Sequence, residues 1–306
     1  MTDLPVLKIK GLAKHFGHIK AVDGLNLHVS KGEIFGLLGH NGAGKSTTMR
    51  MLLSLIKPTS GRIEVFGSEL YSNREKILSD IGSIIEKPDF YPWLSAKTNL
   101  ELFAALSRKP VSKNRISQTL EFVGLAARAG DKVKTYSHGM KQRLGLAQAI
   151  VHDPALIILD EPSNGLDPKG IIELRELILH LKNDLGKTVI LSSHILSEVE
   201  LIADSMAIIH NGRTIIEGSV AKLLSDENLL VRFFVSNPAK AKSAIESSVF
   251  AGKLIEMHNN ELILELNNQD TSRVIRLLLD SGNDLQQVIS RRRLEEYFLK
   301  ITSAAS

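Results

Sequence analysis

Residues Gly36–Arg50 read GLLGHNGAGKSTTMR, an apolar stretch that breaks into glycines and continues with Lys-Ser-Thr. Within it, residues 39–46 fit the pattern G-x-x-x-x-G-K-[ST]. Glycines let backbone N–H groups curl around phosphate oxygens, and a helix that begins there adds the positive end of its dipole. The stretch therefore predicts a strand, a phosphate-binding loop and a helix from about Lys45, which together indicate a nucleotide-binding α/β domain.

The side chains of this loop have distinct expected roles. Lys45 supplies a positive charge to the β- and γ-phosphates, and the Ser46 hydroxyl is placed to ligate Mg²⁺. The alternative is a glycine turn with an incidental lysine, but the strand before the loop and the helix after it favour phosphate binding. We expect nucleotide contacts from Gly39, His40, Asn41, Gly42, Ala43, Gly44, Lys45, Ser46 and Thr47.

A second motif, LIILDEP at residues 156–162, is the expected companion of a phosphate loop. Asp160 ends a short apolar strand, where its carboxylate can hold Mg²⁺, and Glu161 is placed to orient or deprotonate the attacking water. The alternative is a pair of acids at a solvated strand end. We predict Asp160 and Ser46 as metal ligands and Glu161 as a catalytic residue together with Lys45.

The pattern of apolar residues divides the chain of 306 residues into two domains, 1–219 and 220–306. The first alternates strands and helices, and a helical part at about 87–152 includes a helix that Ser95 is placed to cap. ALIILD and TVILSS are short apolar strands, and the segment between them predicts an amphipathic crossover helix. Asn211-Gly212 suits a two-residue hairpin turn. The second domain has the order β-α-β-β-α-β, followed by a helix in RLEEYFLKIT.

Composition excludes several classes of protein. No apolar run approaches the roughly 18 residues of a membrane helix, and the first ten residues show no secretory signal. The absence of cysteine excludes disulfides, thiolate metal sites and cysteine nucleophiles. The net charge of +4 is spread thinly, and acids directly follow the basic run SRRRLEE at 290–296, so we expect no nucleic acid partner. We expect a cytoplasmic protein that acts on a membrane through partners.

The segment before the Asp160 strand carries a resemblance to a known family. Ser137-x-Gly139, followed by KQRLGLAQAIVHDPALIILDEPSNGLDP, resembles the signature region of ABC-transporter ATPases. The usual signature reads Leu-Ser-Gly-Gly-Gln, so Tyr136, His138 and Met140 depart from it. The resemblance implies that Ser137 and Gly139 meet the γ-phosphate of an ATP held by the opposite subunit. Read alone, this segment is a helix cap.

Three further matches are carried by Phe16, Asp167 and His194. Phe16 resembles the aromatic residue that stacks on adenine, Asp167 the loop that crosses the dimer interface, and His194 the switch histidine at the γ-phosphate. Each alone would be unremarkable, a core aromatic or an ordinary histidine. The resemblance covers residues 4–219. It implies the P-loop ATPase fold of the ABC type, with mixed sheets and a helical subdomain, beside a small α+β C-terminal domain.

One departure from the family concerns Glu86, which lies where the family usually has a glutamine that contacts Mg²⁺ or water and responds to the membrane partner. This resembles the variant in ATPases that export antibiotic peptides such as bacitracin and lantibiotics. We hypothesise that Glu86 contacts the metal and tunes coupling rather than chemistry; the alternative is that it faces solvent. The neighbouring Phe90, Tyr91 and Trp93 form either a docking surface or local packing beneath the helical part.

The resemblance implies an ATPase subunit of an ABC transporter, most simply an exporter of a drug or antimicrobial peptide. Two copies would sandwich two ATP-Mg²⁺ and act on separate integral membrane permease subunits at the cytoplasmic face of the membrane. The C-terminal domain also resembles the extension of such exporters and implies a regulatory or dimer-supporting module. Alternatives are a soluble relative that remodels ribosomes or nucleic acid, and an importer ATPase. A P-loop GTPase lacks support, because no Asn-Lys-x-Asp motif is present.

Overall fold

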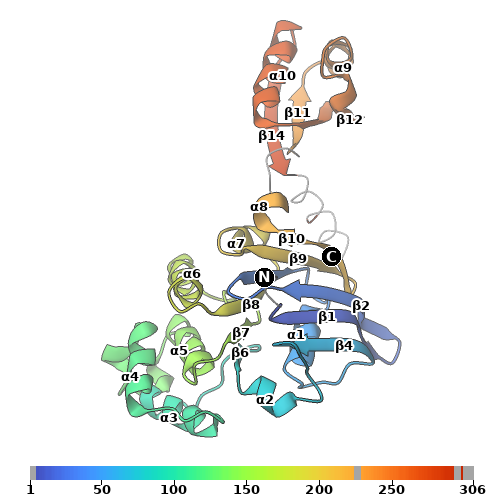
Figure 1. Cartoon of the computed structure of the whole chain (residues 1–306). Coiled ribbons are helices and arrows are strands. Elements are labelled where there is room, and N and C mark those ends of the chain that lie inside the picture. Colours follow the sequence, from blue (N-terminus) through green and yellow to red (C-terminus); the bar gives the residue numbers. More distant parts are fainter. Residues whose placement is uncertain (1–4, 224–228, 293–297, 299–306) are drawn as a thin grey trace. The chain divides into compact units, whose positions relative to one another are not determined.

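The computed structural model describes residues 5–223, 229–292 and 298. The chain divides into two compact units, Met1–Val220 and Ala221–Ser306, labelled by element in Figure 1. The short helix α8 (Val220–Leu223) lies at this division. Each unit has a hydrophobic core of its own.

The larger unit is built on a six-stranded sheet in the order β10-β9-β3-β8-β7-β6. Five neighbouring strands are parallel, and β10 is an antiparallel edge. The apolar runs predicted as buried strands are confirmed, because β7 and β8 are buried along their whole length. The predicted hairpin is also confirmed, with positive φ at Asn211 (49°) and Gly212 (76°) between β9 and β10. The strands are β3 (Ile34–Leu38), β6 (Ile81–Ile84), β7 (Leu156–Leu159), β8 (Thr188–Ser193), β9 (Ser205–His210) and β10 (Arg213–Ser219).

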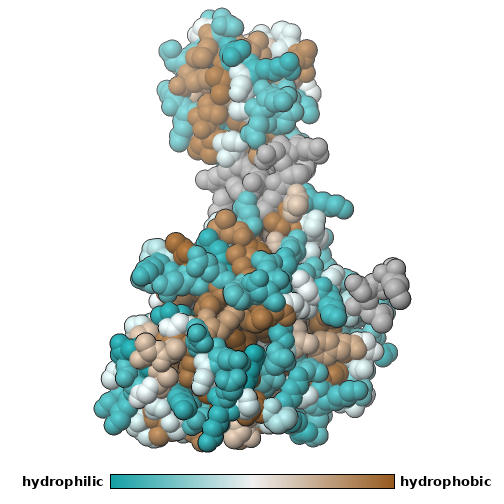
Figure 2. Space-filling view, turned by 60° about the vertical axis from the view of Figure 1, so that its left-hand side comes forward, coloured by the Kyte–Doolittle hydropathy of each residue, from teal (hydrophilic) through white to brown (hydrophobic). Residues whose placement is uncertain are grey.

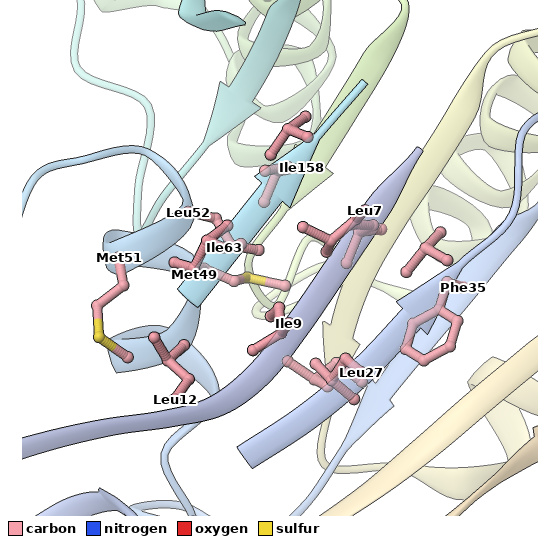
Figure 3. Close-up of a cluster of buried hydrophobic side chains, with 14 of the residues drawn as sticks. Leu7, Ile9, Leu12, Leu27, Phe35, Met49, Met51, Leu52, Ile63 and Ile158 are labelled. Carbon is pink, nitrogen blue, oxygen red and sulfur yellow. The ribbon is translucent and has the colours of Figure 1, made fainter. Parts of the chain in front are cut away.

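An antiparallel sheet in the order β2-β1-β4-β5 completes the core. Helix α1 (Lys45–Leu52), which begins where the sequence predicts, buries Met49, Met51 and Leu52 against apolar residues of both sheets. Figure 3 shows these side chains gathered with Ile9 and Phe35 in one cluster. The core therefore fixes the helix that carries the phosphate loop. The strands are β1 (Leu7–Phe16), β2 (Ile19–Val29), β4 (Ser60–Val65) and β5 (Ser68–Glu69).

Helices α3, α4 and α5 form the helical part, at the lower left of Figure 1. The predicted cap is confirmed, because the Ser95 hydroxyl accepts a hydrogen bond from the Thr98 N–H at 3.1 Å. The crossover helix α6 is also confirmed, and Asp167 caps it by accepting from the Gly170 N–H. The helices are α2 (Arg74–Leu78), α3 (Ala96–Leu106), α4 (Lys113–Phe122), α5 (His138–Ile150), α6 (Pro168–Asn183) and α7 (Leu196–Glu200), with 3₁₀ turns at Ala126–Arg128 and Val133–Thr135.

The smaller unit has the predicted order β-α-β-β-α-β, with its antiparallel sheet ordered β12-β13-β11-β14. Alternate residues of β11 are buried, as the pattern of LLVRFFV predicts. The helix predicted in RLEEYFLKIT lies outside the described residues except for Phe298. The elements are β11 (Leu229–Val235), α9 (Pro238–Glu246), a 3₁₀ turn (Ala251–Lys253), β12 (Leu254–His258), β13 (Glu261–Leu266), α10 (Asn268–Asp280) and β14 (Leu285–Arg292).

The surface of the protein is more polar than its two hydrophobic cores. Figure 2 shows hydrophilic residues over most of the visible face, with smaller apolar areas between them. Over the residues that the structure describes, every helix is too short or too polar to cross a membrane.

Candidate functional site

The predicted functional residues follow the carboxyl ends of adjacent parallel strands. Lys45 follows β3, His194 follows β8, and Glu161 follows β7, while Glu86 follows the edge strand β6. These strands are neighbours in the order β3-β8-β7-β6, so their loops open at the same edge of the sheet. Ligands of open α/β sheets bind at this edge. The fold thus brings together residues that are up to 149 positions apart, as 45 and 194 are numbered.

The phosphate loop is a strained turn that only glycine suits at its tightest point. Gly44 has φ 110°, and a Cβ there would lie 2.5 Å from the Ala21 carbonyl oxygen. Lys45 is 4% exposed, and its ammonium donates to the Gly39 carbonyl at 2.6 Å. A pocket of about 270 Å³ opens over this loop. It is lined by Ala21, His40, Asn41, Gly42, Gly44, Lys45, Ser46, Thr47, Glu161 and Asn164.

Most of the predicted loop residues line this pocket, but two do not. Ala43 is fully buried, and a Cβ on Gly39 would lie 2.5 Å from the Ile209 carbonyl oxygen and 2.9 Å from the Ala43 Cβ. Gly39 and Ala43 therefore hold the loop against the sheet by close packing.

Glu161 lies between two cationic or proton-donating groups. One carboxylate oxygen, Oε1, is 3.2 Å from the Lys45 Nζ, and the other, Oε2, is 2.8 Å from the His194 Nδ1. A carboxylate only accepts hydrogen bonds, so the His194 ring carries its proton on Nδ1 in this contact. Glu161 has φ 48°, a backbone conformation that is uncommon outside glycine and is retained where surrounding contacts enforce it.

Asp160 is buried beside this pair and is oriented by a serine. Its side chain is 4% exposed, and Oδ1 accepts a hydrogen bond from the Ser192 hydroxyl at 2.6 Å. The same hydroxyl accepts from the Glu161 N–H at 2.8 Å. A buried carboxylate is costly unless a cation or hydrogen bonds compensate it. Ser46 lines the phosphate pocket, whereas Asp160 is buried directly before Glu161, which lines it. A hydroxyl and a carboxylate are the hard oxygen ligands that suit Mg²⁺.

The signature segment lies at a second pocket of about 350 Å³, whose lining shares no residue with the first. Ser137 caps α5, because its hydroxyl accepts from the Met140 N–H at 3.2 Å, so the helix-cap interpretation is correct for this state. Ser137 and Gly139 thus do not meet Lys45 within one chain. The second pocket is lined by Ser137, His138, Gly139, Arg143, Gly165, Leu166, Asp167, Lys169, Gly170 and Glu173.

Two residues of the signature helix connect this pocket to the chain just after Glu161. The Gln142 Nε2 donates to the Pro162 carbonyl at 2.7 Å. The His138 Nε2 lies 3.1 Å from the Asn164 carbonyl oxygen, in place of the small residue that the usual signature has. The departure from the signature thus adds a contact between the two motifs.

Glu86 does not line the phosphate pocket. Its backbone is left-handed (φ 63°), its side chain is 65% exposed, and its carboxylate pairs with Arg50 on α1. Glu86 therefore faces solvent in this structure, which was the alternative to metal contact. Its counter-ion, Arg50, was not predicted from the sequence.

Of the aromatic residues near Glu86, one packs against the helical part and two lie exposed, as a docking surface would. Phe90 packs edge-on against Phe103 of α3, with ring centroids 6.1 Å apart. Tyr91 (48% exposed) and Trp93 (62% exposed) lie side by side at 5.7 Å on the surface. Phe16 is also half exposed, at the β1–β2 turn, with the Lys14 ammonium 5.0 Å from its ring centroid. The exposed half of the side chain suits stacking on a nucleotide base.

A groove of about 420 Å³ is lined by residues of α2, β6, α3 and α5. Leu78, Phe103 and Leu106 give it an apolar lining, and Leu106 is 80% exposed. Arg74, Glu75 and Arg108 add charges, and Arg108 pairs with Glu75 at 2.6 Å. The groove lies between the sheet and the helical part, next to the strand that leads to Glu86.

Sequence analysis missed the serines and the glutamate that support the Glu161–His194 pair. They are Ser163, Ser192, Ser193 and Glu198. The available signal was the polar run Ser192-Ser193-His194, which breaks the apolar pattern at the end of β8. Consecutive polar residues at a buried strand end indicate partners on neighbouring strands.

Comparison with known proteins identifies the family of the chain. The ABC transporter family model matches residues 22–164, and a model of an AAA domain matches residues 132–200. The bacitracin transport ATP-binding protein BcrA of Bacillus licheniformis is 42% identical over 97% of both chains. The lantibiotic transport ATP-binding protein SrtF of Streptococcus pyogenes is 45% identical over 69% of this chain and 90% of its own.

Solved structures give the same result. An ATP-binding subunit of an ABC transporter is 32% identical, with a TM-score of 0.64 over 71% of this chain and 91% of its own. A dimeric ATP-binding cassette in a post-hydrolysis state with ADP and Pi is 27% identical, with a TM-score of 0.63 over 70% of this chain and 98% of its own. With a phosphate loop, a paired carboxylate and histidine, and relatives matched along nearly its whole length, the chain belongs to the ATP-binding proteins of ABC transporters.

Proposed function

We propose that this protein hydrolyses ATP to drive export of a drug or antimicrobial peptide through separate membrane subunits. The observation that carries the catalytic part is the position of Glu161, held between Lys45 and His194 at the edge of the phosphate pocket. The export direction and the cargo class are supported by the relatives named for bacitracin and lantibiotic transport.

The residues have separate tasks in this proposal. Lys45 and the loop N–H groups bind the β- and γ-phosphates, and Glu161 accepts a proton from the attacking water. His194 holds the Glu161 carboxylate through Nδ1 and contributes to the γ-phosphate site. Ser46 and Asp160 would hold Mg²⁺, which would neutralise charge on the phosphate oxygens when bound. Phe16 would stack on the adenine.

Two copies of the chain would complete each site. Ser137 and Gly139 lie at a helix N-terminus in a pocket separate from that of Lys45. A hydroxyl, backbone N–H groups and a helix dipole suit a γ-phosphate presented from outside the chain. The Asp167 segment lines the same pocket, and we assign it to the interface between copies. ATP would favour the closed dimer because it binds both surfaces only in that state.

The groove between α2, β6, α3 and α5 would receive an integral membrane permease at the cytoplasmic face of the membrane. Its apolar lining with charged groups has the character of a protein interface, and the exposed Tyr91 and Trp93 add aromatic contact area. Glu86 would respond to this partner through its position between the β6 strand and Arg50. For the smaller unit we propose a regulatory or dimer-supporting role.

The first test is the Glu161→Gln protein. If Glu161 is the base, turnover falls by about 10²–10⁴, while ATP binding is retained, because the amide keeps the shape of the side chain. An unchanged ATPase rate would remove Glu161 from this role. The same variant, purified with ATP from detergent-solubilised cells, should retain a stoichiometric multi-span membrane protein. Ribosomal proteins or nucleic acid in its place would favour a soluble remodelling ATPase. A co-purifying importer complex with a solute-binding protein would show that the transporter imports its cargo and would contradict the proposed export.

A further inference from the structure

Helix α7, which follows β8 after two residues, contains a glutamate that the proposed chemistry does not use. Glu198 directs its Oε2 at two hydroxyl groups from different parts of the chain. The Ser163 hydroxyl donates to it at 2.7 Å. The Ser193 hydroxyl lies 3.1 Å from it and 3.3 Å from the Ile195 carbonyl oxygen, and its single proton favours the nearer, charged acceptor. Ser163 follows Glu161 by two residues, and Ser193 directly precedes His194. One carboxylate oxygen therefore joins the two segments that carry the Glu161–His194 pair.

These contacts close a ring. It runs from Glu161 through the chain to Ser163, across Glu198 to Ser193, on to His194, and back through the 2.8 Å contact between His194 Nδ1 and Glu161 Oε2. In a closed ring the separation of the two segments is set twice, once by the Glu198 bridge and once by the contact that the chemistry needs. Hydrogen bonds to a charged acceptor are among the stronger ones, which suits a fixed geometry.

The surroundings of the ring are partly buried. Ser193 is 2% exposed, and its hydroxyl also accepts from the Ile195 N–H at 2.9 Å, which sets the turn into α7. A small cavity beside Ser163 and Glu198 is lined by apolar residues of α6 and β8, among them Leu174 and Leu191, and by Arg175 of α6. Ser163 and Glu198 are partly buried, so water competes less for the hydrogen bonds of the bridge than it would at a fully exposed site.

We infer that Glu198 is a positioning residue for ATP hydrolysis, which holds the Ser163 and Ser193 segments together and thereby sets the hydrogen bond between His194 and Glu161. The inference rests on the proposed role of Glu161 and deepens it. It also accounts for the left-handed backbone of Glu161 (φ 48°), since the ring and the Ser192 hydroxyl fix both sides of this residue.

The kinetic test compares Ser163→Ala, Glu198→Ala and the double variant with the wild type. A small displacement of a catalytic group costs up to about 100-fold in rate, so we expect each single variant to lower kcat about 10-fold with KM changed less than about twofold. The double variant should be no slower than Glu198→Ala alone, because both changes open the same ring. Losses that multiply, or an unchanged kcat in the single variants, would overturn the inference.

Two further variants separate positioning from a general loss of structure. Ser163→Thr keeps the hydroxyl and should restore a kcat near that of the wild type. Ser197→Ala removes an exposed hydroxyl from the same short helix and should change nothing. A Ser163→Thr protein as slow as Ser163→Ala, or an equal loss in Ser197→Ala, would contradict the bridge.

A second measurement does not depend on activity. Hydrogen exchange of the full chain should be faster in the segments 160–167 and 192–200 of Glu198→Ala, but not of Ser197→Ala. Unchanged exchange in Glu198→Ala would overturn the ring even if the protein had no ATPase activity. Failure of the proposed function is read separately, as a wild-type protein that hydrolyses no ATP or a Glu161→Gln protein with an unchanged rate.

Discussion

At the carboxyl edge of the large sheet, Glu161 and Glu86 differ in the cation that each one faces. Glu161 faces the buried ammonium of Lys45, whereas Glu86, one strand farther along, faces the exposed guanidinium of Arg50. A buried pair is costly to break, because it leaves an uncompensated charge, whereas an exposed pair contributes about 0–1 kcal/mol. The two glutamates therefore differ in what their replacement does.

Replacement of Glu86 by glutamine should leave the isolated ATPase nearly unchanged and reduce transport. The side chain is exposed and away from the phosphate pocket, so stability should change by less than about 1 kcal/mol. The measurement is the ATPase rate of the purified subunit beside the transport rate of the complex with its permease. Arg50→Gln, which removes the counter-ion, is the matched control and should reproduce the transport defect. If Glu86→Gln had the wild-type rate in both the ATPase assay and the transport assay, the coupling role would be refuted.

His152 should make the folded protein sensitive to mild acid. Burial lowers the pKa of its imidazole, and its Nε2 donates to the Ile81 carbonyl at 3.2 Å. The unfolded chain binds a proton near its ordinary pKa of about 6.5, before the folded protein does, so stability present above that pH is lost as the pH falls.

The measurement for His152 is urea denaturation at several pH values between about 7.5 and 5.5. His152→Gln, which keeps an N–H donor, should show a smaller fall in unfolding free energy over this range than the wild type. His18→Gln changes an exposed histidine in the β1–β2 turn and should behave as the wild type does. Equal slopes for His152→Gln and the wild type would exclude His152 as the cause.

The stability of helices in the larger unit depends on their N-caps as well as on their apolar patterns. Ser95 fixes the first turn of α3 with its hydroxyl on the Thr98 N–H, and its backbone carbonyl accepts from the Asn99 side chain at 2.9 Å. Ser95→Ala should therefore destabilise the protein by about 1 kcal/mol, the usual cost of a lost N-cap. Urea denaturation measures the change. Ser95→Asp, which restores a cap acceptor, should recover most of it, and no loss in Ser95→Ala would show that the cap is not limiting.

The elements that sequence predicted well are those with a signal in one segment. The apolar runs of β7 and β8, the glycines before α1 and the alternation in β11 each identify their element locally. β6 was missed because four residues that include Gly82 and Ser83 form no recognisable apolar run. α7 has five residues, too few for a helical period.

The residues of the candidate site that belong to recognisable sequence motifs could be predicted, and the others could not. Lys45, Asp160, Glu161 and His194 lie in recognisable patterns and come together as the parallel order requires. The bridge of Glu198 to Ser163 joins segments 35 residues apart, and that pairing exists only once β7 and β8 are neighbours. The same holds for Arg50 and Glu86, 36 residues apart. Side-chain partners across strands are set by register, which no single segment encodes.

At the scale of the whole molecule, two hydrophobic cores form within one chain. One surrounds α1 in the larger unit, and the other lies between the sheet of the smaller unit and its helices α9 and α10. A ligand stabilises the structure that binds it, by about 2.7 kcal/mol at 100 times its dissociation constant. Mg-ATP should therefore protect the larger unit alone.

Hydrogen exchange with and without Mg-ATP tests this expectation in the full chain. The segments of β3, β7 and β8 should exchange more slowly with the nucleotide, and β11 and β13 of the smaller unit should not change. Equal protection of both units would show that they unfold as one.

The order of strands in the large sheet has a consequence for how such a protein diversifies. Each loop at the carboxyl edge follows its own strand, and the loop after β6 lies at the border of the sheet. Its residues can be exchanged without moving β7, β8 or β3, whose loops carry the chemistry. Under the proposed function, a lineage that keeps the loops after β3, β8 and β7 and changes the loop after β6 would acquire a new membrane partner while it retains its ATPase chemistry.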